Sequence, residues 1–178
     1  MKIGFDQNIY LLGFMGSGKS TMGPLLAKKL KMAFFDTDEC VENKSGKSIA
    51  QIFLEEGEFS FREQERLCID MVSHLHQFVV AIGGGAVMFA DNWLNIKNSG
   101  LTVYLKCPFH AIWDRIKESK TRPLLSTNNS QQQFTKMKQL LTKRLPFYER
   151  ADLIFQYQEG ESAIETTNRL ARQLEDFI

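Results

Sequence analysis

The chain has 178 residues, of which 43% are hydrophobic and 24% are charged, so its composition is globular and excludes global disorder. A net charge of +1 argues against a protein whose main task is to bind nucleic acid or an acidic membrane. No apolar run approaches the ~20 residues that span a bilayer, and the first residues lack a signal-peptide pattern, so we expect a cytoplasmic protein with one domain over residues 1–178.

Short apolar segments alternate with longer amphipathic segments along the chain. In chain order, they predict a strand at 8–12, a helix at 19–30, a strand at 33–35, helices at 48–54 and 58–75, a strand at 78–82, a helix at 90–97, a strand at 101–105, a helix at 108–118, a strand at 152–157 and a helix at 162–177. Strands and helices that alternate in this way form a parallel α/β sheet, whose ligands bind beyond the carboxyl ends of the strands.

One polar segment interrupts this alternation. Residues 119–133 are rich in Asn, Gln and Ser, and a helical pattern resumes near Phe134. A loop of this length within a compact domain is usually functional. Because Arg122 lies at its start, we predict a mobile lid over residues 119–133.

The three cysteines are odd in number and widely spaced along the chain. Cys40, Cys68 and Cys107 match neither a disulfide framework nor a zinc site. We therefore expect each of them to be a small buried hydrophobic residue in a protein of a reducing compartment.

A phosphate-binding pattern lies between the first predicted strand and the first predicted helix. Residues 13–20, GFMGSGKS, match GxxxxGK followed by Ser or Thr. Glycines allow successive backbone N–H groups to converge on phosphate oxygens, and the helix that follows directs its positive dipole end toward them. Lys19 adds a charge for the β- and γ-phosphates, and the hydroxyl of Ser20 suits Mg²⁺. The motif predicts a nucleoside triphosphate site.

Two carboxylates follow the second predicted strand. Side chains two positions apart on an extended segment point the same way, so Asp36 and Asp38 are expected to face one cleft near the phosphate loop. One would help to hold Mg²⁺ through water, and the other would bind or deprotonate an acceptor hydroxyl. The structural alternative is that an Asp in this segment is the N-cap of a following helix.

Arginines and a triple glycine are further candidates for binding a ligand or stabilising a transferring phosphoryl group. Arg62 is either solvated, as most helical arginines are, or grips a carboxylate with two hydrogen bonds in a cleft. Gly83, Gly84 and Gly85 indicate either a close approach to the main chain or a tight turn. Phosphoryl transfer needs positive charge on the moving group, which a lid-borne Arg122 would supply.

Together these motifs resemble the shikimate kinases, a family of small P-loop kinases related to the nucleoside monophosphate kinases. The resemblance covers residues 8–157 and includes GEFSFREQE at 57–65, RPLL at 122–125 and RLPFYERAD at 144–152. It implies a three-layer P-loop kinase fold with a five-stranded parallel sheet of order 2-3-1-4-5 and a substrate-binding helical region at about 38–75. It further implies a monomer that uses ATP and Mg²⁺ to phosphorylate the 3-hydroxyl of shikimate, on the route to chorismate and the aromatic amino acids.

The resemblance also implies a role for individual residues. Asp38 would be the base, while Lys19 and Arg122 would stabilise the transferring phosphoryl group. Ser20 would ligate Mg²⁺, with Asp36 contributing through water. The implied ATP-binding residues are Gly13, Met15, Gly16, Ser17, Gly18, Lys19, Ser20, Thr21, Arg115 and Arg122. The implied acceptor-binding residues are Asp38, Phe53, Phe61, Arg62, Glu65, Gly83, Gly84, Gly85 and Arg144.

The sequence leaves two other functions open. A kinase for another small acceptor, such as gluconate or a nucleotide, would share the fold and the phosphate loop. A non-catalytic nucleotide-binding regulator would not need all the catalytic charges that this chain carries. The chain also has Ile82 where the family usually has Ser or Thr before the triple glycine.

Overall fold

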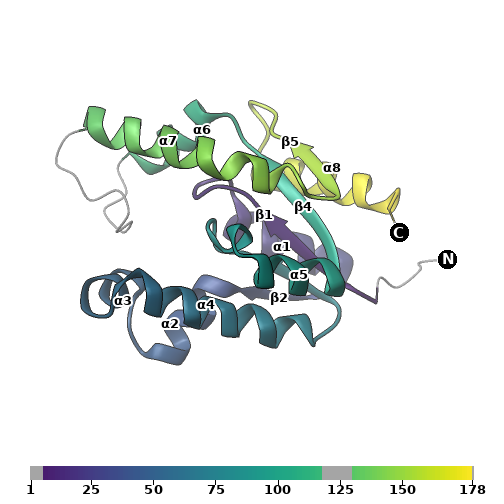
Figure 1. Ribbon diagram of the computed structural model, residues 1–178. Helices are drawn as coiled ribbons and strands as arrows, with labels where there is room; N and C mark the ends of the chain where they lie inside the picture. Colours follow the sequence, from purple (N-terminus) through teal and green to yellow (C-terminus); the bar gives the residue numbers. More distant parts are fainter. Residues whose placement is uncertain (1–5, 118–129, 178) are drawn as a thin grey trace.

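The structure is a computed structural model that describes residues 6–117 and 130–177. A parallel sheet of order β2-β3-β1-β4-β5 forms its centre, which confirms the predicted order 2-3-1-4-5 (Figure 1). The strands are β1 (Asn8–Leu12), β2 (Ala33–Asp36), β3 (Phe78–Ala81), β4 (Gly100–Lys106) and β5 (Leu153–Gln156).

Helices cover both faces of this sheet. They are α1 (Lys19–Leu30), α2 (Thr37–Ser45), α3 (Ile49–Glu55), α4 (Gly57–Ser73), the short 3₁₀ helix η1 (Ala86–Met88), α5 (Ala90–Ser99), α6 (Phe109–Ile116), α7 (Ser130–Tyr148) and α8 (Ala163–Glu175). None of the helices in the described parts of the chain has the length and apolarity that a membrane crossing requires.

The alternation of side chains along β1 divides the core into two layers. Ile9 and Leu11 pack with α1 and α8, whereas Tyr10 and Leu12 belong to the core on the opposite face, beneath α4 to α7. Every residue of β1 is buried, as expected for a central parallel strand covered on both faces. The buried strand β1 fixes the position of the phosphate loop, because the loop begins directly after Leu12.

The boundaries of most elements lie within two residues of the prediction. The capping box predicted for the last helix is present, because Ser162 and Glu165 exchange side-chain and backbone hydrogen bonds. Helix α7 begins at Ser130, four residues before the predicted resumption at Phe134, and the rest of the predicted lid, with Arg122, lies outside the described residues.

Helix α2 was not predicted, and it corrects the argument about the acidic pair. The chain leaves the extended conformation after Asp36, whose Oδ1 accepts a hydrogen bond of 2.9 Å from the backbone N–H of Asp38. Asp36 is therefore the N-cap of α2, as the structural alternative held. The two carboxylates reach the same region because a helix starts between them and not because they share the face of a strand.

The pairing of Cys40 with Cys68 also corrects the sequence prediction. A disulfide links these residues of α2 and α4, whose Cα atoms are 6.3 Å apart. Cys107 remains a free and buried cysteine, as predicted. The packing of α2 against α4 brings the paired residues together across 28 positions of sequence, a separation that carries no local signal.

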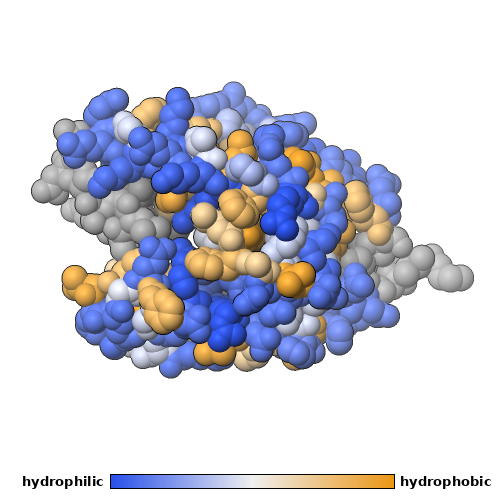
Figure 2. All heavy atoms as spheres, in the orientation of Figure 1, coloured by the Kyte–Doolittle hydropathy of each residue, from blue (hydrophilic) through white to orange (hydrophobic). Residues whose placement is uncertain are grey.

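The face of the molecule in Figure 2 is mostly hydrophilic, and apolar side chains gather on it over α5 and the turn before it. The exposed members of this group include Met88, Phe89 and Leu94.

Candidate active site

A cavity of about 650 Å³ opens beyond the carboxyl ends of the central strands. The phosphate loop, the β2–α2 junction, helices α3 and α4, the triple glycine and the end of α7 all contribute to its wall. The predicted residues that line it are Met15, Gly16, Gly18, Lys19, Ser20, Thr21, Asp36, Asp38, Phe53, Phe61, Arg62, Glu65, Gly83, Gly84, Gly85 and Arg144. The lining also includes Ile82 and residues that we had not singled out, namely Glu42, Ser48, Ile49, Ala50 and Ala81.

The phosphate loop has the backbone that its glycines predict. Gly13, Gly16 and Gly18 have φ angles of 146°, 75° and 99°, which side chains with a Cβ rarely adopt. The Nζ of Lys19 donates hydrogen bonds of 2.8 and 3.1 Å to the carbonyls of Gly13 and Phe14. No acidic residue lies in the first turn of α1, so no side chain of this turn neutralises the positive dipole end that faces the loop.

Four residues of the predicted ATP site lie outside the cavity wall or outside the described residues, and the first of them is Gly13, whose carbonyl accepts a hydrogen bond from Lys19. Ser17 is buried within the loop. Arg115 lies against the loop, because its Nη1 donates a 2.9 Å hydrogen bond to the carbonyl of Gly16 and its guanidinium stacks on Tyr157. Arg122 lies outside the described residues.

The side-chain oxygens of Ser20 and Asp36 lie next to each other at the end of the phosphate loop. The hydroxyl of Ser20 donates a hydrogen bond of 2.8 Å to Oδ2 of Asp36. Mg²⁺ at nucleotide sites prefers oxygen ligands and keeps several waters while it binds one or two protein groups and the phosphates. The two residues therefore fit a magnesium ion that arrives with a nucleotide.

Arg62 places its guanidinium in the wall of the cavity rather than in solvent. Its side chain is only 12% exposed, and it forms ion pairs of 2.7 Å with Glu65 and 3.0 Å with Glu58. A Cβ on Gly85 would lie 2.6 Å from Nη2 of Arg62, and a Cβ on Gly83 would lie 2.1 Å from Oε1 of Glu65. These close approaches explain why the segment after β3 consists of glycines.

Arg144 reaches the same cavity from α7. Its side chain is buried, and its Nε has no hydrogen-bond partner among the residues that the structure describes. The guanidinium lies 5.7 Å from the centroid of the Phe14 ring, which belongs to the phosphate loop. A buried guanidinium donor without a partner costs free energy unless an anion or another acceptor binds it.

The carboxyl of Glu65 lies between the two arginines and Asp38. Burial raises the pKa of Glu65 to about 7, although the ion pair with Arg62 opposes this shift, and the charge of Asp38 adds to it. Oε1 of Glu65 has no hydrogen-bond partner among the described residues. The site therefore contains a carboxyl that gains or loses its charge near neutral pH.

The raised pKa of Glu65 predicts how stability depends on pH. An unfolded Glu titrates near 4.5 and the folded carboxyl near 7, so the folded state binds more protons between these values. The stabilisation by Glu65 is complete below pH 4.5 and is lost as the pH rises through 7. We expect the free energy of unfolding of the wild type, relative to Glu65→Gln, to fall by at most about 1.4 kcal/mol per pH unit in this window.

Urea unfolding of both proteins at a series of pH values between 4 and 8 measures this difference. Glu63→Gln, on the exposed part of the same helix, is the matched control. A difference between wild type and Glu65→Gln that stays constant over this range would contradict the raised pKa.

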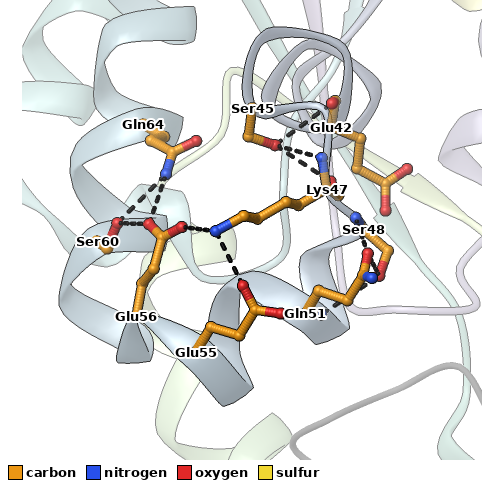
Figure 3. Close-up of polar contacts among 9 residues, drawn as sticks. All are labelled: Glu42, Ser45, Lys47, Ser48, Gln51, Glu55, Glu56, Ser60 and Gln64. Carbon is orange, nitrogen blue, oxygen red and sulfur yellow. Dashed lines mark hydrogen bonds and ion pairs between the residues drawn. The ribbon is translucent and has the colours of Figure 1, made fainter.

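A network around Lys47 fixes the helices behind the cavity. Figure 3 shows its amine between Glu55 and Glu56, at 2.9 and 2.7 Å, while Ser60 donates a hydrogen bond of 2.6 Å to the other oxygen of Glu56. These contacts join the α2–α3 connection to the α3–α4 junction. They hold α3, whose Phe53 lines the cavity.

Comparison with known proteins places the chain in one family. The family model described as "Shikimate kinase" matches residues 15–175. A curated shikimate kinase of Nostoc punctiforme is 41% identical over 171 residues, which cover 96% of this chain and 92% of that protein.

Alignment with solved structures points to the same family. A shikimate kinase from Acinetobacter baumannii in complex with shikimate aligns with a TM-score of 0.85 at 34% identity, covering 98% of this chain and 93% of that one. The shikimate kinase from Bacteroides thetaiotaomicron aligns with a TM-score of 0.87 at 35% identity, covering 95% of this chain and 98% of that one. Because the family model and these relatives match nearly the whole chain, this chain belongs to the shikimate kinase family.

Proposed function

We propose that the chain transfers the γ-phosphoryl group of ATP to the 3-hydroxyl of shikimate, giving 3-phosphoshikimate and ADP. The observation that carries this proposal is a single cavity that joins a phosphate loop to Asp38 and to two arginine side chains, Arg62 and Arg144. A nucleotide needs the first part, and a small hydroxylated carboxylic acid needs the second. Membership of the family supports the same activity.

In this proposal the two arginines bind the carboxylate of shikimate. Arg144 offers a buried Nε that lacks a partner among the described residues, and Arg62 exchanges its exposed partner Glu58 for the substrate. Phe53 and Phe61, whose ring centroids are 5.0 Å apart, pack against the carbon ring.

Asp38 takes the proton of the 3-hydroxyl as that oxygen bonds to the γ-phosphorus. The bond from phosphorus to the bridging oxygen breaks, and ADP leaves with this electron pair. Lys19, joined by Arg122 from the predicted lid, stabilises the negative charge on the transferring group. Bound Mg²⁺ supplies further neutralisation of the phosphate charge; Ser20 would hold it directly and Asp36 through water.

The first experiment compares acceptors. ADP release from Mg-ATP is measured with shikimate, gluconate, AMP and no acceptor. Turnover that requires shikimate supports the proposal. Turnover with gluconate or AMP would assign the cavity to another acceptor, and the absence of turnover with all of them would favour a non-catalytic nucleotide-binding protein.

Loss of Arg62 is expected to weaken the acceptor site selectively. Arg62→Ala should raise the KM for shikimate by roughly 10–100-fold, since the loss of one charge-assisted hydrogen bond costs about 1.5–3 kcal/mol. The affinity for ATP should persist, because the contacts of Arg62 with other described residues do not include the phosphate loop. Steady-state kinetics with each substrate varied in turn provides the test.

Arg66→Ala is the matched control for this variant. Arg66 lies one turn later on α4, and its ion pair with Glu63 is exposed. An undiminished shikimate affinity in folded Arg62→Ala would remove Arg62 from the acceptor site.

A further inference from the structure

The hydroxyl of Tyr148 contacts the triple glycine from the far end of helix α7. Tyr148 is the last residue of this helix and is fully buried, with its ring stacked on that of Tyr104 at a centroid distance of 5.2 Å. Its hydroxyl donates a hydrogen bond to the carbonyl oxygen of Gly84. This bond joins segments that lie 64 residues apart in the sequence.

The other backbone N–H and C=O groups of the triple glycine either form hydrogen bonds within the protein or have no partner among the described residues. The carbonyls of Gly83 and Gly85 accept hydrogen bonds of 3.1 and 3.2 Å from backbone N–H groups of the following turn, and the N–H of Gly83 donates to Thr37 at 2.9 Å. The N–H groups of Gly84 and Gly85 have no partner among the described residues. They are therefore the two donors that this segment has left for a ligand in the cavity.

The bond from Tyr148 determines the direction of one of these donors. The carbonyl of Gly84 and the N–H of Gly85 belong to the same peptide group, which is planar and trans, so they point in opposite directions. Between two glycines such a peptide group rotates with little steric resistance. A hydrogen bond that holds the carbonyl therefore holds the N–H of Gly85 as well.

The same bond aligns the acceptor-binding arginine of α7 with this peptide group. Arg144 lies one turn before Tyr148, and a Cβ on Gly84 would be 3.3 Å from its Nη1 and 3.4 Å from the oxygen of Tyr148. On the other side, a Cβ on Gly85 would be 2.6 Å from Nη2 of Arg62. The N–H of Gly85 thus belongs to a peptide group between the two guanidinium groups.

Burial keeps the Tyr148 hydroxyl in its donating form. Desolvation raises the pKa of Tyr148 far above its ordinary value, although the nearby guanidinium of Arg144 opposes this shift. The hydroxyl therefore carries its proton at neutral pH.

We propose that Tyr148 is a positioning residue for the acceptor: by holding the Gly84 carbonyl, it directs the N–H of Gly85 toward the anionic hydroxy acid that Arg62 and Arg144 bind. The inference rests on the proposed function, since it concerns the same acceptor. Tyr148 itself does not touch the reacting atoms.

Tyr148→Phe removes the hydroxyl and keeps the buried ring. We expect the KM for shikimate to rise by roughly fivefold to tenfold, the usual effect of one lost hydrogen bond, with kcat and the KM for ATP within about twofold of the wild type. Tyr104→Phe is the matched control, because it removes a phenol hydroxyl from the same stacked pair, and its KM for shikimate should stay unchanged.

If Tyr148 had only a structural role, Tyr148→Phe would lower the melting temperature and raise the KM values for both shikimate and ATP. It would not raise the KM for shikimate alone. An unchanged KM for shikimate in folded Tyr148→Phe would overturn the inference. The wild type and Tyr104→Phe test the proposed function separately, because both keep the Tyr148 hydroxyl and should turn over shikimate whatever the result for Tyr148→Phe.

A measurement on the wild type covers the case in which Tyr148→Phe does not fold. In protein labelled with ¹⁵N-glycine, saturating shikimate should shift the amide resonance of Gly85, whereas that of Gly46, at the end of α2, should stay in place. If the Gly85 resonance does not move when shikimate binds, this N–H does not contact the acceptor and the inference falls.

Discussion

Replacing Asp38 by asparagine is expected to lower the kcat for shikimate phosphorylation by about 10²–10⁴-fold, the usual contribution of a general base. Asparagine keeps the size of the side chain and the backbone N–H that donates to Asp36 at 2.9 Å, so the start of α2 should persist. The carboxylate that we propose as the acceptor of the hydroxyl proton is lost. Steady-state ADP release with saturating ATP and shikimate measures the effect.

Glu39→Gln is the matched control for this variant. Glu39 follows Asp38 in the first turn of α2 but is exposed to solvent, and it does not line the cavity. Its replacement should leave kcat within about twofold of the wild type, as for most surface substitutions away from a site. If Asp38→Asn kept more than a tenth of the wild-type kcat, the base would have to be another group.

Lys19→Met is expected to lower kcat by about 10²–10³-fold, the range observed when one preorganised donor to the transition-state charge is removed. Methionine retains much of the apolar stem and removes the charged amine. The hydrogen bonds of this amine to the carbonyls of Gly13 and Phe14 are lost as well, so the affinity for ATP should also fall.

The control for Lys19→Met comes from the same helix. Lys29 is exposed in the last turn of α1, and Lys29→Met changes the net charge equally without reaching the phosphate loop. Single-turnover kinetics of Lys19→Met measure the rate of phosphoryl transfer, and nucleotide titration measures the affinity of the variant for ATP. A Lys19→Met variant with nearly normal single-turnover rates would exclude Lys19 from the stabilisation of the transferring group.

The features that the sequence predicted correctly are those with local signals. The phosphate loop combines a spacing of glycines with a strand before it and a helix after it, and the positive φ angles of three of these glycines follow from that motif. The capping box at Ser162 is a pattern of four residues. The apolar strands were recognisable because both of their faces are buried.

Helix α2 escaped prediction because it buries very little apolar surface. Of its nine residues only Thr37, Cys40 and Val41 are buried, so its sequence shows no clear helical period. The cap formed by Asp36 depends on a carboxylate that also accepts a hydrogen bond from Ser20, and one residue type does not reveal two contacts.

The other missed features are contacts between distant segments. The disulfide joins residues 28 positions apart, and the bond from Tyr148 to Gly84 spans 64. The two cysteines and Tyr148 carry no local pattern, and the triple glycine around Gly84 indicates a close approach or a tight turn without identifying the partner. Such contacts exist only once α2, α4 and α7 have packed, so they require the three-dimensional arrangement.

The wall of the cavity consists of segments with very different positions in the chain. The phosphate loop is one continuous run of eight residues, 13–20, between a strand and a helix. The proposed acceptor-binding residues come from three places: the insertion between β2 and β3, the turn after β3, and the end of α7. Substitutions within one short segment can therefore alter the nucleotide site. A change of acceptor, in contrast, requires coordinated substitutions in three separate segments of the chain.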